Sequence, residues 1–264
     1  MTPRSAIGSF VRRDARVAWS YRLPLLFAEV VSALFLLITF VYVGRLVEPG
    51  RFPGGYFSFA AAGIALTTFL QTGVATLASN FRQEQVQGTL EATLSVGLPV
   101  RTVAAGVAAY PMAFAAARAA VYVGLAAVLG ARAPGGNWGL ALYAVVAGSI
   151  AFAGLGLVAA ALVVLFRQGQ SAAAFLVTLL ALAAGTLFPP ELLPGWAKGL
   201  SELSPFTSSL RLVRGALLEG DSWSASVGGA AVLAALAAAF AVAGVAALAW
   251  SIRRAMRTGA IADY

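Results

Sequence analysis

Few side chains in this sequence could do chemistry. Its 264 residues include no His and no Cys, which removes the commonest general base, the commonest metal ligand and all thiolate chemistry. The one lysine, Lys198, lacks the glycine spacing of a phosphate-binding loop before it. We therefore expect no catalysis by this chain alone, and no metal, cofactor or nucleotide bound by it.

The densest group of polar side chains is residues 81–101, FRQEQVQGTLEATLSVGLPVR. Apolar stretches flank it on both sides, so we expect it to lie in water at a membrane surface. Glu84 and Glu91, seven positions apart, fall on nearly the same face of a helix, and Leu90 and Leu94 could form an apolar anchor. The pattern predicts a short amphipathic helix or helix pair that a partner could bind. A solvated loop without a partner is the alternative.

The elements that must position these residues are apolar helices. Hydrophobic residues make up 60% of the chain and charged residues 11%, with a mean hydropathy of +0.86, which indicates a polytopic all-α membrane protein. The net charge of +8 does not suggest nucleic-acid binding, because the basic residues lie at the ends of apolar segments and no stacking aromatics are interleaved with them.

Six stretches satisfy the rule that a helix needs about 20 apolar residues to cross a bilayer. They form a predicted transmembrane domain over residues 23–250, with spans near 23–44, 57–79, 100–130, 138–166, 170–188 and 226–250. Most Lys and Arg residues fall on the side that holds both termini and residues 81–101, which predicts that this side is cytoplasmic.

Two further segments complete the predicted architecture. Residues 1–22 carry Phe10 and Trp19 on one stripe and several arginines on the other, which predicts an amphipathic helix on the cytoplasmic leaflet, and residues 251–264 form a cytoplasmic tail. The long connection at 188–224 has two short apolar faces, so we expect a re-entrant helical hairpin before the last span.

Ionisable residues inside a span are costly and mark a pathway or a pair. At 1.5 Å per residue, Glu29 counted from Leu23 would lie about 9 Å deep and Arg118 counted from Ala104 about 21 Å deep, which argues against a direct pair. Arg118 is then a residue that lines a path or contacts a head group, or a structural arginine that snorkels. Span two also carries polar residues suited to a dimer interface, a substrate path or ordinary hydrogen bonding between helices: Thr67, Thr68, Gln71, Thr72 and Thr76.

Two ordered motifs give a family resemblance. Glu84, the run Gln87-Gly88-Thr89-Leu90-Glu91, Leu94 and Pro99 resemble the signature that follows the second span of type-2 ABC transporter permeases. Phe188-Pro189-Pro190, Leu193-Pro194-Gly195-Trp196, Leu203-Ser204-Pro205-Phe206 and Leu212-Val213-Arg214 through Gly220 look like the segment before the last span of that family. Gln85 to Gln87 depart from the family pattern, which puts in doubt which ATPase the chain accepts.

The resemblance implies a role for each segment. Residues 81–101 would hold a coupling helix that fits a separate ATPase subunit through Arg82, Glu84, Gly88, Thr89, Leu90, Glu91 and Leu94. Two such subunits, which bind ATP and Mg, would act with two permease chains, either two copies of this chain or this chain and a paralogue, in a bacterial inner membrane. The complex would export an amphipathic, drug-like or lipid-linked substrate by alternating access, along a path that includes Thr68, Gln71, Thr72, Arg118 and Phe188.

Two other functions fit parts of the sequence. A membrane enzyme acting on lipid could use acidic residues near the outer face, such as Glu191 and Glu202. A membrane anchor that holds an ATPase without transporting would share the segment at 81–101. Turnover without a partner would favour the first alternative, and the absence of substrate-stimulated ATP hydrolysis would favour the second.

Overall fold

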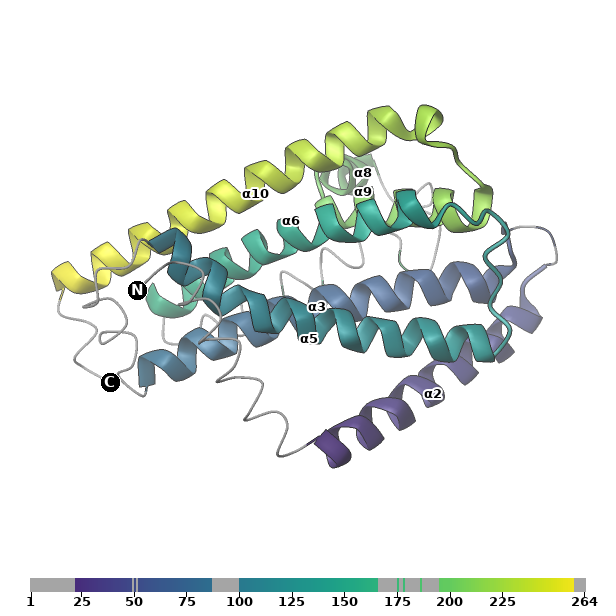
Figure 1. Ribbon diagram of the computed structural model, residues 1–264, viewed down its shortest axis with the longest axis horizontal. Helices are drawn as coiled ribbons and strands as arrows, with labels where there is room; N and C mark the ends of the chain where they lie inside the picture. The colour runs from purple at the N-terminus through teal and green to yellow at the C-terminus, as the bar shows by residue number, and fades with distance from the viewer. Residues whose placement is uncertain are drawn as a thin grey trace.

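The computed structural model describes residues 22–48, 50, 52–86, 100–165, 175, 178, 186 and 195–258. Over these residues the chain is helical, without strands, as predicted. Five long helices are drawn in Figure 1: α2 (Arg22–Leu46), α3 (Tyr56–Val86), α5 (Val100–Val128), α6 (Trp138–Leu165) and α10 (Trp223–Thr258). Between α6 and α10 lie α8 (Gly195–Glu202), α9 (Pro205–Arg214) and a π-helical turn, η2 (Gly215–Glu219).

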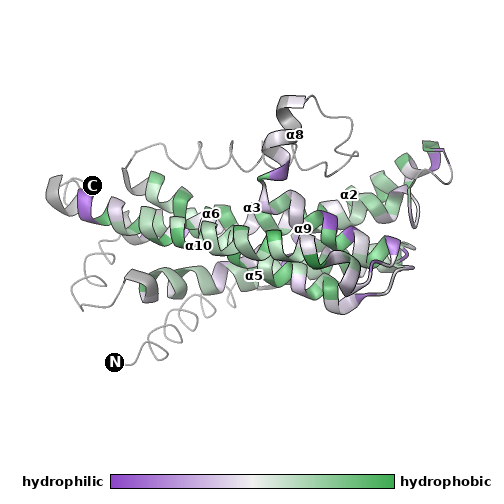
Figure 2. Cartoon of the chain, turned by 90° about the horizontal axis from the view of Figure 1, so that it is seen from above, coloured by the Kyte–Doolittle hydropathy of each residue, from purple (hydrophilic) through white to green (hydrophobic). Residues whose placement is uncertain are grey.

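All five long helices are long and apolar enough to cross a membrane. They coincide with five of the six predicted spans, and hydrophobic residues cover most of their length, with hydrophilic residues gathered toward their ends (Figure 2). The predicted span at 170–188 lies outside the described residues apart from residues 175, 178 and 186, and the predicted helix in residues 1–22 also lies outside them except for Arg22. α10 continues to Thr258, into the predicted tail.

The first four long helices, α2, α3, α5 and α6, alternate in direction along the molecule, whereas α10 runs in the same direction as α6 (Figure 1). α2 and α5 end where α3, α6 and α10 begin, and residues 47–55 and 129–137 connect helices there; we call this the short-loop end. α3 ends and α5 begins at the other end, with residues 87–99 between them. The antiparallel arrangement of α2, α3, α5 and α6 follows because short connections can join only neighbouring ends, whereas more than 50 residues separate α6 from α10.

Glycines let α6 and α10 pack more extensively than any other pair of described elements. A Cβ atom at Gly154 of α6 would overlap the backbone of Phe240, and one at Gly244 of α10 would overlap the backbone of Gly154. Small residues at a crossing allow such close backbone approach, which replaces the hydrophobic driving force that is absent between helices in lipid.

The short helix α9 is buried although its sequence is polar. Pro205 occupies its first turn, where a missing N–H costs nothing. Phe206 packs at 6.0 Å between ring centres against Phe152 of α6, which in turn lies 5.8 Å from Phe69 of α3. Ser209 donates a 2.9 Å hydrogen bond to the carbonyl of Ala144. α9 is therefore held among the long helices by both apolar and polar contacts.

Candidate functional site

Arg118 on α5 joins three helices through charged and polar contacts. Its Nη2 atom lies 2.7 Å from Oε2 of Glu29 on α2, and the two side chains are 31% and 17% exposed. Its Nη1 atom donates a 2.7 Å hydrogen bond to Oγ1 of Thr72 on α3, which is buried. A charged group among apolar helices is costly unless it is paired. Here Glu29 neutralises the charge of Arg118, and Thr72 accepts one of its hydrogen bonds. We call Glu29, Thr72 and Arg118 the polar cluster.

The prediction that Glu29 and Arg118 lie too far apart in depth to pair is wrong. That prediction assumed that both helices begin at one membrane surface. In the structure α2 begins beside the middle of α5 (Figure 1), so Glu29, near the start of α2, lies level with Arg118 in the second half of α5. The shift of one helix along another is set by tertiary packing and cannot be counted from span boundaries.

A tyrosine that the sequence argument passed over completes the surroundings of the polar cluster. Tyr122, one turn after Arg118, is buried, hydrogen-bonds Thr68 on α3 and interacts electrostatically with Glu29 and Arg118. Its position four residues after an intramembrane arginine was the signal that could have found it, because residues at this spacing share a helix face.

The predicted path residues on α3 do not face one direction. Thr68 and Thr72 face α5, whereas Gln71 is exposed. Thr67 turns toward Thr186, with 3.2 Å between the two hydroxyl oxygens. Phe188 lies outside the described residues. The structure thus brings Thr68, Thr72 and Arg118 together and leaves Gln71 at the surface beside them.

The polar cluster has hydrogen-bonding capacity that it does not use. Within the described part of the chain, Nε of Arg118 and Oε1 of Glu29 are buried and have no hydrogen-bond partner. Buried polar atoms without partners raise the free energy of this arrangement. The pair can therefore gain hydrogen bonds if a helix movement or a polar ligand brings new partners to it.

A second arginine, Arg214 at the end of α9, is only 7% exposed. Its Nη2 atom donates to the carbonyl oxygens of Phe59, at 3.0 Å, and Thr186, at 2.7 Å, and its guanidinium carbon lies 3.4 Å from the centre of the Phe59 ring. A Cβ at Gly63 would come within 2.8 Å of Nη2, so the glycine makes room for it. Burial lowers the pKa of Arg214 to about 9, which leaves it charged at neutral pH.

Two of the predicted coupling residues, Arg82 and Glu84, lie near the C-terminal end of α3. α3 continues through Val86, so Arg82 and Glu84 belong to its last two turns rather than to a separate loop. Phe81 is fully buried with Leu77, because the two apolar residues are spaced four apart and extend one face of α3. The remaining predicted coupling residues lie outside the described residues: Gly88, Thr89, Leu90, Glu91 and Leu94.

The carboxylates proposed for the enzyme alternative do not gather into a described site. Glu202 on α8 is exposed, and Glu191 lies outside the described residues. Among the residues that the structure describes, no three His, Cys, Asp or Glu side chains come together in a way that could hold a metal ion.

A comparison with protein families identifies the class of protein to which the chain belongs. A family model described as ABC-2 type transporter matches residues 9–218. The chain belongs to this family. The resemblance inferred from the two motifs is thereby confirmed, and the chain is a permease subunit, a multi-pass membrane component of an ABC transporter. Permeases of the family work with ATP-binding subunits, typically as dimers. A search of curated proteins gave no match to this permease.

Proposed function

We propose that this permease exports an amphipathic substrate, drug-like or lipid-linked, by alternating access at the interface between two permease chains. The observation that carries the proposal is the polar cluster, which keeps an ion pair inside helices that are otherwise apolar. An intramembrane ion pair costs free energy and persists where it serves a pathway or a conformational change. The family match supports the transport class, and the polar cluster supports the position of the path.

We place this path along the exposed side of α3. Gln71 directly precedes Thr72 and is exposed, whereas the apolar window of α3 is mostly buried within the chain. A polar amide at membrane depth is unfavourable against lipid, so it should face protein or a wet cavity. A second permease chain opposite this surface would enclose a path with the polar cluster beside it.

The topology that the sequence predicts supports the proposed energy source. Both termini and residues 81–101 would face the cytoplasm of a bacterial cell, where two copies of an ATPase subunit bind ATP and Mg. Glu84 and Glu91 would contact basic groups or backbone donors of the ATPase, and Leu90 and Leu94 would pack into its groove. Closure of the ATPase pair would then move α3 and α5, which flank this segment and both contribute to the polar cluster.

The test is co-purification of the full-length permease with the soluble protein that it retains from its source cells. We expect a retained ATPase in the wild type, and a loss of most binding or ATP hydrolysis in a Glu84→Ala/Glu91→Ala variant, because both carboxylates would lie on the helix face proposed to contact the partner. A Gln83→Ala/Gln85→Ala variant changes the same segment without removing charge and should bind as the wild type does. Retention of no nucleotide-hydrolysing protein, or equal binding by both variants, would exclude the coupling role.

A further inference from the structure

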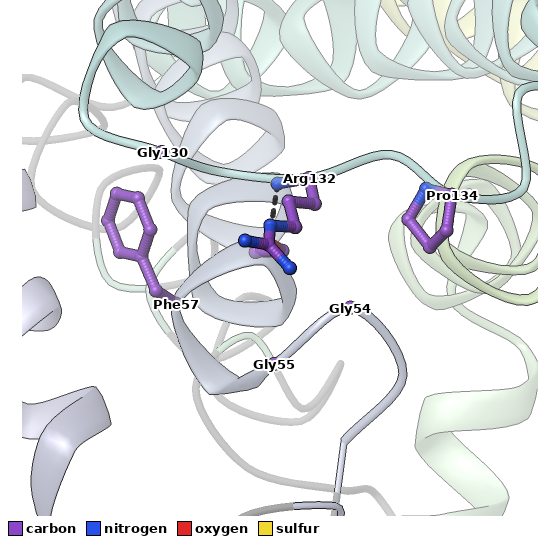
Figure 3. A pocket seen from close by; sticks show the side chains of 7 residues that line it. Gly54, Gly55, Phe57, Gly130, Arg132 and Pro134 are labelled. Carbon is purple, nitrogen blue, oxygen red and sulfur yellow. Dashed lines mark hydrogen bonds between the residues drawn. The ribbon is translucent and has the colours of Figure 1, made fainter.

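A cavity of about 500 Å³ opens at the short-loop end (Figure 3). Its lining comes from the connection before α3, the first turn of α3 and the connection between α5 and α6: Gly54, Gly55, Phe57, Ser58, Gly130, Arg132 and Pro134.

The two connections are held in fixed shapes around this cavity. Gly130, with φ of +96°, ends α5, and the next N–H, that of Ala131, donates back to the carbonyl of Ala126 over 2.8 Å, as in a Schellman motif. Gly54, also at positive φ, approaches Pro134 and Leu218 so closely that an added Cβ would lie 3.5 Å and 3.4 Å from them. The cavity is therefore formed by an ordered backbone rather than by the chance position of side chains.

Arg132 supplies the cavity with a positive charge. Its backbone N–H donates a 2.9 Å hydrogen bond to the buried hydroxyl oxygen of Ser58, which fixes the residue at the start of α3. Figure 3 shows its side chain extending between Phe57 and Pro134. Its side chain is exposed, and none of the carboxylates in the described ranges forms an ion pair with it. A guanidinium group matches a phosphate group in geometry and charge.

The cavity lies at the ends of the apolar helices, where lipid headgroups are expected. The apolar windows of the neighbouring helices end at Leu46 and Val128 and begin at Tyr56 and Trp138, so most lining residues lie just beyond them. Trp138, Trp223 and Tyr42 are exposed near the same helix ends. Exposed Trp and Tyr residues at helix ends are typical of the interface between membrane and water.

We propose that this cavity binds the phosphate group of an anionic membrane lipid, with Arg132 as its counter-charge. The open space at Gly55 and Gly130, where an added Cβ would meet nothing within 4 Å, lets a headgroup approach the backbone. Phe57 and Pro134 offer apolar contact beside the charge. The site would tie the α2–α3 and α5–α6 connections to the bilayer surface independently of the substrate and of the ATPase.

The test measures lipid binding to the full-length permease in detergent by native mass spectrometry, with short-chain phosphatidylglycerol as the probe and phosphatidylcholine for comparison. We expect phosphatidylglycerol to bind more tightly, and Arg132→Gln to weaken its binding roughly fivefold, the effect of removing one basic residue near an anionic surface. Arg132→Lys should keep most of the affinity, and Arg132→Gln should fold, because its backbone N–H can still bond Ser58.

The matched control is Arg45→Gln, which removes an exposed charge at the same end of the molecule but outside the cavity lining. Equal losses in Arg132→Gln and Arg45→Gln would overturn the site, since they would reflect net charge alone. Inorganic phosphate at millimolar concentration should not displace the lipid. Displacement by inorganic phosphate, or equal binding of phosphatidylcholine, would identify a general anion or surface contact and overturn the assignment to an anionic lipid.

Discussion

Two arginines lie among the apolar helices of this permease, and their surroundings differ. Arg118 contacts side chains, a carboxylate on α2 and a hydroxyl on α3. Arg214 donates to the backbone carbonyls of Phe59 and Thr186 and lies over an aromatic ring.

The difference indicates what each arginine can do. Backbone carbonyls move only with their whole segment, so Arg214 fixes α9 against α3 and the residue at 186 in one arrangement. Side-chain partners on two separate helices can exchange, and α2 buries little of its surface in the chain, since only 11% of its apolar window is buried. We therefore expect Arg214 to be structural, and we propose that Arg118 takes part in a conformational change of the transporter.

The largest expected effect is the loss of Arg214. Arg214→Met removes the guanidinium that donates to the carbonyls of Phe59 and Thr186, and it should lower the free energy of unfolding by about 2–5 kcal/mol. Thermal unfolding of the purified chain, followed by tryptophan fluorescence, measures this change. Arg211→Met removes an exposed arginine from the same helix and should have little effect. Similar shifts in the two variants would show that Arg214 does not fix α9.

A smaller effect is expected at the polar cluster. In a double-mutant cycle of Glu29→Gln and Arg118→Met, the interaction free energy should be about 1–2 kcal/mol, because membrane-embedded polar contacts contribute less than the buried structural site. The same unfolding assay reports it. An interaction free energy near zero would mean that the two side chains do not pair, and a value above that of Arg214 would reverse the comparison.

The sequence predicts the apolar helices well because each is specified locally. A window of some 20 apolar residues defines a span by itself, and even the unexpected extension of α3 follows from the spacing of Leu77 and Phe81. The family could be predicted from the sequence for a similar reason, because the two motifs that indicate it are short and follow a fixed order along the chain.

The sites were harder to predict because they depend on how helices sit against one another. Glu29 and Arg118 meet only because α2 is shifted along α5. From the sequence alone, Arg214 would be placed on the surface of a polar helix. Its burial requires the space at Gly63, which is more than 150 positions earlier in the sequence. The predicted coupling residues Gly88 to Leu94 lie outside the described residues and remain a prediction.

The most direct test of the central claim is whether water reaches the surface of α3 beside Arg118 in one state of the transporter and not in another. The chain has no cysteine, so a single Gln71→Cys can be labelled without background from this chain. In the assembled transporter, we predict that a water-soluble maleimide labels it at rates that differ several-fold between the nucleotide-free and the vanadate-trapped state, whereas Phe35→Cys on the exposed apolar face of α2 stays unlabelled in both. Equal labelling of Gln71→Cys in the two states, or none in either, would contradict a path along this surface.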